Sequence, residues 1–321
     1  MKNTLMMAAA LMIGITPAAV SAQTAPSARV QARVPSAAER GFYKMKLGDF
    51  TIVALNDGIF ELATDQLLLD RVPGEVKRLL AQDKQPATQP TSVNAYIIDT
   101  GTRRILVDTG SGSYFGPTLG FAMAGLKAAG YRPEDIDEVL ITHMHPDHIG
   151  GLAAAGAMAF PNAMIRADKA ELSFWLDKAN ASKVDGSVAS SFAAATGSLA
   201  PYIAAGRVKT FDKGEMLDPG IYSVRLPGHT VGHTAYRVQS AGRTMLIWGD
   251  VMHVASVQLK DPRITIKFDS EPTRALASRD EALADAAKGR YLVAGAHLAF
   301  PGVGTIGRSS TAWTWTPVSA R

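Results

Sequence analysis

The sequence predicts an α/β protein in which β-sheets are covered on the outside by helices. From residue 50 onward, short apolar runs bounded by turn-forming residues alternate with a few amphipathic stretches of helical spacing. No internal repeat with a period of about 20–50 residues interrupts this pattern. The chain has 321 residues, of which 47% are hydrophobic and 19% charged, so it can bury a complete core. Strand clusters separated by helices imply sheets with helical layers outside.

The predicted strands and helices follow from these runs in chain order. Apolar or alternating segments predict strands over residues 50–55, 92–99, 104–108, 138–141, 163–167, 220–226, 234–239, 243–248, 265–268 and 291–294. Amphipathic stretches predict helices over residues 120–129, 167–179, 188–199 and 273–288, and over part of 73–81. The mostly polar stretch 180–186 is predicted to be a loop.

The N-terminal segment has the pattern of an export signal. A single lysine precedes an apolar run, interrupted by Pro17, that ends in small residues. Residues 1–22 are therefore predicted to be a signal peptide cleaved after Ala22, giving a periplasmic or secreted protein without a stable membrane span. Residues 23–39 are rich in Ala, Pro, Ser and Gln and predict a flexible leader. Residues 40–321 are predicted to form one domain.

The composition excludes several kinds of site. Cysteine is absent, so the sequence cannot form a disulfide, a thiolate zinc site or a cysteine nucleophile. The formal net charge of +4 is too small to indicate nucleic acid binding. Any metal must therefore bind through histidine, aspartate or glutamate. The chain has seven histidines, all of them in the part from His143 onward, and this clustering is the first functional signal.

Four candidate metal ligands follow one predicted strand. His143 and His145 are separated by one residue, so an extended chain places both imidazoles on one face, where they can hold one divalent ion. Asp147 and His148 come where the strand breaks and can reach a second ion. Gly150 then permits a tight turn. Without a metal, such a cluster would leave buried polar groups without partners, so a polar loop with chance histidines is the weaker interpretation.

Three further candidate ligands each follow a different predicted strand. They are His229, Asp250 and His297. By itself, a Gly-Asp or Gly-His pair after a strand usually indicates only a turn. Their joint occurrence with the first cluster is the strong signal, because two metal ions need more ligands than the first cluster supplies.

In these motifs the chain resembles the metallo-beta-lactamase-fold hydrolases. The resemblance rests on segments 106–110, 143–148, 227–229, 249–250 and 295–297, and it extends over about residues 50–305. It implies a four-layer αββα sandwich, with two sheets between outer helices and the site at one sheet edge. The metal ligands that it implies are His143, His145 and His229 for one ion, Asp147, His148 and His297 for the other, and Asp250 as a bridge between them.

Within that superfamily, the chain is most similar to the branch that contains methyl parathion hydrolase and dihydrocoumarin-type lactone hydrolases. The similarity implies an apolar substrate pocket walled by Phe115, Trp175 and Phe192. Without it, an aromatic residue in a helix, such as Trp175, is more often part of the core. Further substrate-binding residues are implied at positions where organophosphate- and lactone-hydrolysing members differ, and here they look like the lactone and aryl-ester side: Leu68, His253, Ile266 and Phe268.

Three of four further residues near these motifs leave two interpretations open. His253 follows Asp250 by three residues and could line the mouth of the metal site, or it could be a solvated or supporting histidine. His233 is predicted to brace a ligand loop and not to bind metal. Asp108 and Thr109 could orient the ligand histidines, but an Asp-Thr-Gly sequence after a strand is equally typical of a turn.

The predicted function is hydrolysis with two divalent metal ions, with zinc favoured and cobalt, manganese and iron as alternatives. Two such ions would activate a shared water and polarise the oxygen of the group under attack. Asp147 and Asp250 are the predicted catalytic residues. A phenol has a pKa of about 10, so a phenolate leaves with little protonation. Aryl esters and aromatic lactones of the dihydrocoumarin type are therefore the predicted substrates, with weak organophosphate triester hydrolysis as a side activity.

Alternative functions remain open. A methyl-parathion-type phosphotriesterase or an acyl-homoserine lactonase would use the same centre. A beta-lactamase is disfavoured because its thiolate-using classes need cysteine. A non-catalytic metal-binding scaffold is disfavoured because no ligand is missing, and a nucleic-acid-processing enzyme because of the near-neutral charge. The apolar run Leu67–Leu69 indicates either a homodimer contact or a pocket rim, and a homodimer is expected.

Overall fold

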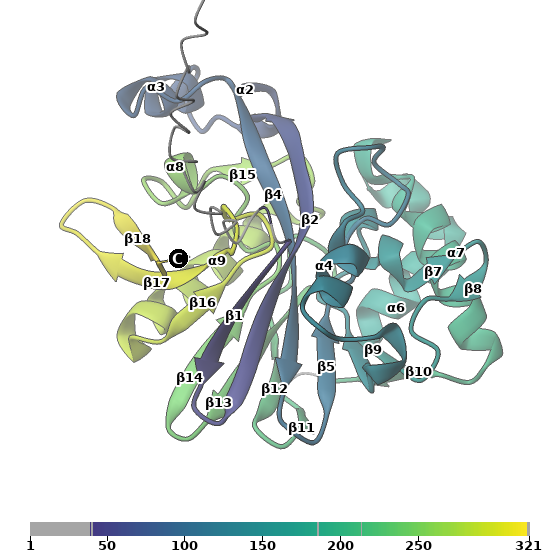
Figure 1. Cartoon of the computed structure of the whole chain (residues 1–321). Helices are drawn as coiled ribbons and strands as arrows, with labels where there is room; N and C mark the ends of the chain where they lie inside the picture. Colours follow the sequence, from purple (N-terminus) through teal and green to yellow (C-terminus); the bar gives the residue numbers. More distant parts are fainter. Residues whose placement is uncertain (1–38, 40, 185, 213, 320–321) are drawn as a thin grey trace, which may run out of the picture. The chain divides into compact units, whose positions relative to one another are not determined.

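The computed structural model describes residues 39, 41–184, 186–212 and 214–319 (Figure 1). The predicted signal peptide and almost all of the predicted leader lie outside these residues. Two seven-stranded sheets organise the described part of the chain. None of its helices is long and apolar enough to cross a membrane.

The first sheet combines an antiparallel half with a parallel half. Strands β1, β2, β4 and β5 pair antiparallel, whereas β5, β6, β9 and β10 pair parallel. In spatial order the strands are β1 (Phe42–Leu47), β2 (Phe50–Ala63), β4 (Thr88–Asp99), β5 (Arg104–Val107), β6 (Glu138–Leu140), β9 (Met164–Asp168) and β10 (Val208–Phe211).

The second sheet is antiparallel except where β14 pairs with β16. In spatial order its strands are β11 (Met216–Asp218), β12 (Ile221–Arg225), β13 (Thr234–Ser240), β14 (Arg243–Ile247), β16 (Leu292–Ala294), β17 (Val303–Arg308) and β18 (Trp313–Pro317). Because β12 and β14 both run antiparallel to β13, β12, β14 and β16 point the same way. Their C-terminal ends therefore lie at one edge of the sheet.

The packed side chains define four layers. Apolar residues of both sheets, such as Ile98 and Ile247, share one buried cluster, so the sheets pack face to face. The other face of the first sheet packs against α4 (Ala122–Ala128), α6 (Lys169–Leu176) and α7 (Ser191–Ala204). The other face of the second sheet packs against α9 (Pro272–Gly289). Each large apolar side chain buried in this way stabilises the fold by about 1.5–3 kcal/mol. The expected αββα sandwich is confirmed.

Smaller elements extend the molecule beside the sheets. The short strands β3 (Leu68–Leu69) and β15 (Thr265–Ile266) pair with each other and share an apolar cluster with α3 (Glu75–Gln82) and α8 (Ala255–Gln258). The remaining pieces are α2 (Thr64–Leu67), α5 (Pro146–Ile149), a ribbon of β7 (Ala153–Ala154) and β8 (Ala157–Met158), and short 3₁₀ segments at Pro133–Asp135, Gly150–Leu152, Lys178–Lys183 and Gly186–Val188.

Several element boundaries differ from the prediction. The predicted strand 50–55 continues through a bulge between Asn56 and Gly58 to Ala63, because Asn-Asp-Gly is here a bulge and not the turn that it resembles. The backbone of Gly58 has φ +130° and lies against the Thr118 carbonyl oxygen, which a side chain would meet at 2.1 Å. Strands β1, β10, β11, β17 and β18 were not predicted, because they are short or carry polar residues. The predicted loop 180–186 is largely 3₁₀ turn.

Candidate metal centre

The candidate ligands lie at strand ends that meet at one place. His143 and His145 follow β6 in the first sheet. In the second sheet, His229 follows β12, Asp250 follows β14 and His297 follows β16. The two sheets are joined beside them, because the Thr234 N–H donates to the Thr142 carbonyl oxygen at 2.9 Å. Candidate ligands as far apart in the sequence as Asp147 and His297, which are 150 positions apart, are thus neighbours.

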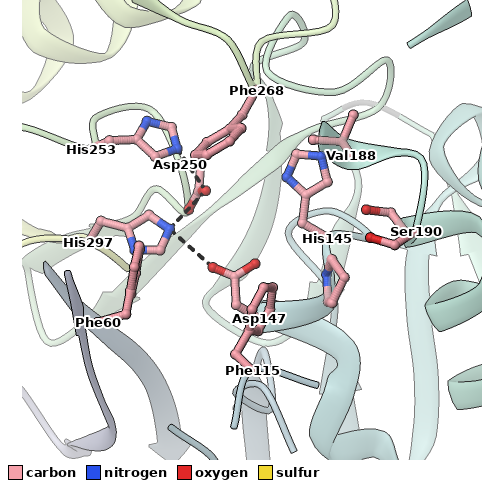
Figure 2. Close-up of a pocket in the computed structure, with 12 residues that line it drawn as sticks. Phe60, Phe115, His145, Asp147, Val188, Ser190, Asp250, His253, Phe268 and His297 are labelled. Atoms are coloured by element: carbon pink, nitrogen blue, oxygen red, sulfur yellow. Dashed lines mark hydrogen bonds and ion pairs between the residues drawn. The ribbon is translucent and has the colours of Figure 1, made fainter. Parts of the chain in front are cut away.

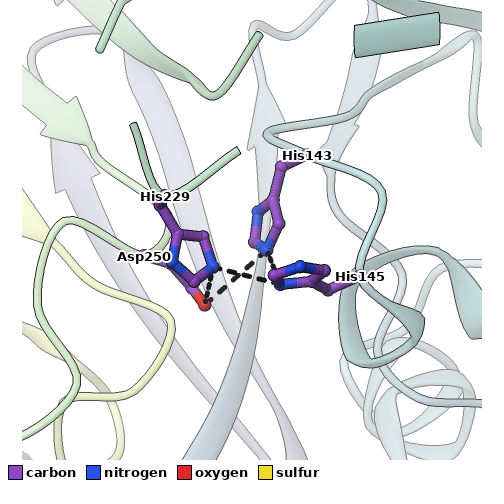
Figure 3. Close-up of side chains that lie close together, drawn as sticks. All are labelled: His143, His145, His229 and Asp250. Atoms are coloured by element: carbon purple, nitrogen blue, oxygen red, sulfur yellow. Dashed lines mark hydrogen bonds and ion pairs between the residues drawn. The ribbon is translucent and has the colours of Figure 1, made fainter. Parts of the chain in front are cut away.

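The first ligand group consists of His143, His145, His229 and Asp250, whose side chains point toward a common centre in Figure 3. The ligand atoms lie within 4.8 Å of one another. His145 Nδ1 is 3.0 Å from His143 Nε2 and 3.1 Å from His229 Nε2. Asp250 Oδ2 is 3.3 Å from His229 Nε2 and 3.7 Å from His143 Nε2. Three imidazoles and one carboxylate oxygen are a set that suits tetrahedral zinc.

The second ligand group consists of Asp147, His148 and His297, and Asp250 joins it to the first. Asp147 Oδ2 is 3.5 Å from His148 Nε2 and 3.4 Å from His297 Nε2. Asp250 Oδ1 is 3.2 Å from His148 Nε2, while Asp250 Oδ2 is 3.0 Å from His297 Nε2. Asp250 is thus a carboxylate whose oxygens contact imidazole nitrogens of both groups.

The buried atoms of these two groups fit a pair of cations. His148 Nε2 and Asp250 Oδ1 are both buried, and neither makes a hydrogen bond to any residue that the structure describes. In the first group, His145 Nδ1 faces both His143 Nε2 and His229 Nε2 at about 3 Å. Buried polar atoms in this state are destabilising unless something binds them. Divalent ions would bind these buried atoms. The nitrogen lone pairs that face one another would then point at a cation.

The charges of the candidate centre also fit a pair of cations. Burial and the neighbouring imidazoles hold the pKa of His143 and of His145 well below 6.5, so both are neutral, as metal ligands must be. Burial also opposes charge on His148 and His229, but the surrounding aspartates outweigh it. They raise the pKa of His148 well above 6.5 and that of His229 to about 9. The carboxylates therefore draw positive charge into the centre, which metal ions would supply.

Hydrogen bonds behind the ligands fix which nitrogen faces the centre. His148 Nδ1–H donates to Asp108 Oδ2 at 2.8 Å. His229 Nδ1–H donates to Asp269 Oδ1 at 2.9 Å, and His297 Nδ1–H donates to the Ser92 carbonyl oxygen at 3.0 Å. In the neutral ring that binds a metal, each of these bonds keeps the proton on Nδ1 and leaves the Nε2 lone pair facing the centre.

The two predicted supporting residues, Asp108 and Thr109, both contact His148. Besides the bond from Asp108, the Thr109 hydroxyl donates to the His148 carbonyl oxygen at 2.9 Å. Asp108 holds φ +58°, a conformation rare for residues other than glycine. Its carboxylate also accepts from the N–H and hydroxyl of Thr142 at 2.8 and 2.7 Å. This segment therefore orients a ligand as well as making a turn.

His233 braces the Asp250 loop, as predicted. Burial lowers the pKa of His233 to about 3, so the ring is neutral. Its Nδ1–H donates to the Leu226 carbonyl oxygen at 3.0 Å, and its Nε2 accepts from the Asp250 N–H at 3.0 Å. Gly249 makes this approach possible, because a Cβ there would lie 2.7 Å from His233 Nε2.

A cavity of about 200 Å³ opens onto both ligand groups (Figure 2). Asp147, Asp250, His145 and His297 form its polar side. The apolar side chains that line it are Phe60, Phe115, Val188 and Phe268. His253 lies between the two sides, with Nε2 at 3.1 Å from Asp250 Oδ2 and its ring stacked on His297. An apolar molecule in this cavity would lie directly against the ligand groups.

The predicted substrate-binding residues fall into two sets. Phe115, His253 and Phe268 line the cavity. Trp175 and Phe192 do not; they are buried against each other, and the edge of Trp175 packs on His145. Leu68 and Ile266 do not line it either, because they pair across β3 and β15 inside an apolar cluster. These last four residues support the wall from behind.

Sequence reasoning missed several residues of the site. Phe60 lines the cavity and packs its edge on His297, but it lies beyond the end of the predicted strand. Asp269, the partner of His229, and Glu171 on α6 had no motif around them. A buried acid within a helix, such as Glu171, has the same sequence signature as an exposed one. Only the packing of α6 identifies it.

Comparison with known proteins agrees with this geometry. A family model for the metallo-beta-lactamase superfamily matches residues 88–297. A beta-lactamase-like protein 2 homolog from Caenorhabditis elegans is 32% identical over 85 residues, which cover 26% of this chain and 27% of that protein. An atrochrysone carboxyl ACP thioesterase from Passalora fulva is 36% identical over 85 residues, covering 26% of this chain and 24% of that protein. The chain thus spans about a quarter of the length of these curated relatives.

Two solved structures match over most of their length. The hydrolase AbOPH, of the beta lactamase superfamily, is 33% identical with a TM-score of 0.82, over 88% of this chain and 98% of that chain. AidC, a dizinc quorum-quenching lactonase, is 26% identical with a TM-score of 0.80, over 87% of this chain and 98% of that chain. Because the family model spans more than half of the sequence and a hydrolase of this superfamily matches most of the fold, the chain belongs to the metallo-beta-lactamase superfamily.

Proposed function

We propose that the protein hydrolyses aryl esters and aromatic lactones of the dihydrocoumarin type, within the methyl parathion hydrolase and dihydrocoumarin hydrolase branch of the superfamily. The observation that carries the proposal is the cavity. Three phenylalanines, Phe60, Phe115 and Phe268, line the same cavity of about 200 Å³ as Asp147 and Asp250. Such a space favours a compact aromatic substrate, because aromatic walls gain both buried area and ring-edge contacts.

The chain's own residues would divide the work. His143, His145 and His229 would hold one ion, Asp147, His148 and His297 the other, and Asp250 would contact both. Two divalent ions bound there would supply Lewis acidity and lower the pKa of a water molecule. The ligand set favours zinc. The phenylalanine walls would orient the aryl group and exclude bulk water.

The two aspartates would manage the protons. Asp147 and Asp250 are the carboxylates that line the cavity, so either can accept a proton from the attacking water. An alkoxide leaving group needs a proton, which Asp250 could return to it. A phenolate needs little protonation, since its conjugate acid has a pKa of about 10. Phenol esters are therefore expected to react faster than alkyl esters of the same size.

Acyl-homoserine lactone hydrolysis is the second candidate. The observation in its favour is the similarity of the fold to AidC, a quorum-quenching lactonase, with a TM-score of 0.80. That reaction expels an alkoxide and must accommodate an acyl chain. Organophosphate triester hydrolysis would use the same centre, and we propose it as a weak side activity.

A substrate panel tests the proposal. The purified protein, reconstituted with zinc, cobalt or manganese, would be assayed with dihydrocoumarin, phenyl acetate, methyl parathion and N-hexanoyl homoserine lactone. The expected order of kcat/KM places the first two substrates highest. A preference for the acyl-homoserine lactone would favour the second candidate, and inactivity toward dihydrocoumarin, phenyl acetate and methyl parathion would reject the proposed substrate class. Phe268→Ala should raise KM for the aryl substrates, while Phe121→Ala, at an exposed phenylalanine outside the cavity lining, should not.

A further inference from the structure

Glu171 is a buried acid beside the first ligand group that the proposed reaction does not use. It lies on α6 in the outer helical layer and is 1% exposed. Its Oε1 accepts from the Met144 N–H at 2.9 Å and from the Trp175 Nε1–H at 2.7 Å. Its Oε2 accepts from the Gly232 N–H at 2.8 Å. Both carboxylate oxygens are therefore engaged by N–H donors.

The two backbone donors belong to the two loops that carry the first ligand group. Met144 lies between His143 and His145, in the loop that follows the first sheet's β6. Gly232 lies three residues after His229, in the loop between β12 and β13 of the second sheet. One side chain thus connects the ligand loops of both sheets. The third donor, Trp175, packs its ring edge on His145, with ring centroids 5.6 Å apart.

The loop that carries His229 is seated tightly on α6. A Cβ at position 232 would lie 2.5 Å from the Glu171 backbone nitrogen and 2.6 Å from the Glu171 Cβ. Only glycine allows this approach. The distance between the loop and the helix is therefore fixed by contact as well as by the hydrogen bond.

No other side chain can replace the carboxylate in this position. All three partners are donors, so the group between them must accept on both of its ends. A glutamine offers one acceptor oxygen and one NH₂ group, so it would set a donor against a donor at Gly232 or at Met144 and Trp175. Leaving a buried N–H without an acceptor is destabilising, and the nearby loop would move to relieve it.

The second ligand group is held by different residues. His148 is oriented by Asp108, and His297 by the Ser92 carbonyl oxygen. Neither of these residues is a hydrogen-bond partner of Glu171. A change at Glu171 is therefore expected to act on one of the two groups.

We propose that Glu171 is a positioning residue that sets the metal affinity of the site formed by His143, His145 and His229. It does so by holding their two loops at a fixed separation, and the site formed by Asp147, His148 and His297 does not depend on it. This inference rests on the proposed dinuclear hydrolase, because it requires that the protein hold two ions.

The test is the metal content of Glu171→Gln. Zinc-loaded wild-type and variant proteins would be dialysed against a graded series of chelator concentrations, and the zinc retained per chain would be measured by mass spectrometry. We expect the variant to lose one ion at about 10–100-fold lower chelator strength and the other at the wild-type strength, since supporting residues change metal affinity by about that factor. Cobalt-loaded samples would show the loss as a change in the absorption of one of two sites.

Glu138→Gln is the matched control. Glu138 is also a buried glutamate, 4% exposed, but it lies in β6 beside Arg103 and Arg166. This variant should retain both ions as the wild type does, even if its unfolding temperature falls. Gly232→Ala perturbs the same contact from the loop side. It should weaken the same single site, and it provides the answer should Glu171→Gln not fold.

The outcomes separate the two claims. A wild-type protein that retains no ions would overturn the proposed function itself. A wild type with two ions and a Glu171→Gln variant with the same retention curve, or with equal weakening of both sites, would overturn only the role assigned to Glu171.

Discussion

At the scale of single residues, the centre depends on which nitrogen of each histidine is free. Asp108, Asp269 and the Ser92 carbonyl oxygen each accept from the Nδ1–H of a ligand ring. The ligand face of the ring is then determined by a hydrogen bond on the opposite face. His233 is oriented in the same way, but both of its nitrogens bond to the backbone and neither faces the metal centre. They join the Leu226 carbonyl oxygen to the Asp250 N–H.

Replacing His233 with leucine tests this bracing role. The change leaves the buried Asp250 N–H and Leu226 carbonyl oxygen without partners, and each such group costs about 1–3 kcal/mol. We expect the free energy of unfolding to fall by at least about 2 kcal/mol, measured by urea denaturation in the presence of chelator. The chelator removes metal loss as a cause. An unchanged denaturation midpoint would show that His233 does not hold the loop.

At the scale of elements, the ligand loops are held by close backbone contacts. α5 carries Asp147 and His148, and it is followed by Gly150. A Cβ on Gly150 would lie 2.1 Å from the Ser111 carbonyl oxygen. The same neighbouring segment holds His148, because the Thr109 N–H donates to the His148 carbonyl oxygen at 2.7 Å. The position of the second ligand group therefore depends on Gly150, which is not itself a candidate metal ligand.

Gly150→Ala should separate these two segments. The backbone oxygen of Ser111 cannot rotate away as a flexible side chain could, so the segment must shift, and overpacking of this kind costs about 1–3 kcal/mol. We expect a lower unfolding temperature and weaker retention of the second ion. Gly186→Ala is the control, because a Cβ at Gly186 meets no atom of the described residues within 4 Å. Equal melting temperatures for the two variants would contradict the prediction.

At the scale of the whole molecule, the candidate centre lies where the two sheets meet. The first sheet supplies His143 and His145, and the second supplies His229, Asp250 and His297. The Tyr236 hydroxyl donates to the Ile141 carbonyl oxygen at 2.5 Å, so the sheets are also joined by hydrogen bonds next to the ligands. Ions bound here would connect the two halves of the sandwich.

Metal binding is therefore expected to stabilise the whole fold. A ligand at 100 times its Kd that binds only the folded state adds about 2.7 kcal/mol of stability. Thermal unfolding should thus occur at a higher temperature with zinc than after chelation. Adding zinc to the chelated protein should restore the higher unfolding temperature. Calcium is the control, because it prefers oxygen ligands and should have little effect. Identical melting curves with zinc and with chelator would contradict the metal centre.

The sequence alone predicts the α/β class and the candidate metal ligands, because both predictions rest on patterns of neighbouring residues. The spacing of His143, His145, Asp147 and His148 and the position of each later ligand after an apolar run need no knowledge of packing. Strand boundaries were less predictable: the Asn56–Gly58 bulge has the residues of a turn, and only its pairing with β4 shows that the strand continues.

Tertiary structure decides the rest of the site, because it depends on contacts between distant segments. Phe60 lines the cavity since the continued β2 reaches it, while Trp175, Phe192, Leu68 and Ile266 are packed behind the lining. The partnership of Asp269 with His229 and of Glu171 with two loops joins residues 27 to 61 positions apart. An acidic residue has the same local sequence signal whether it is solvated or buried. Only the fold determines which acidic side chains are buried and form the hydrogen bonds that hold the candidate ligands in place.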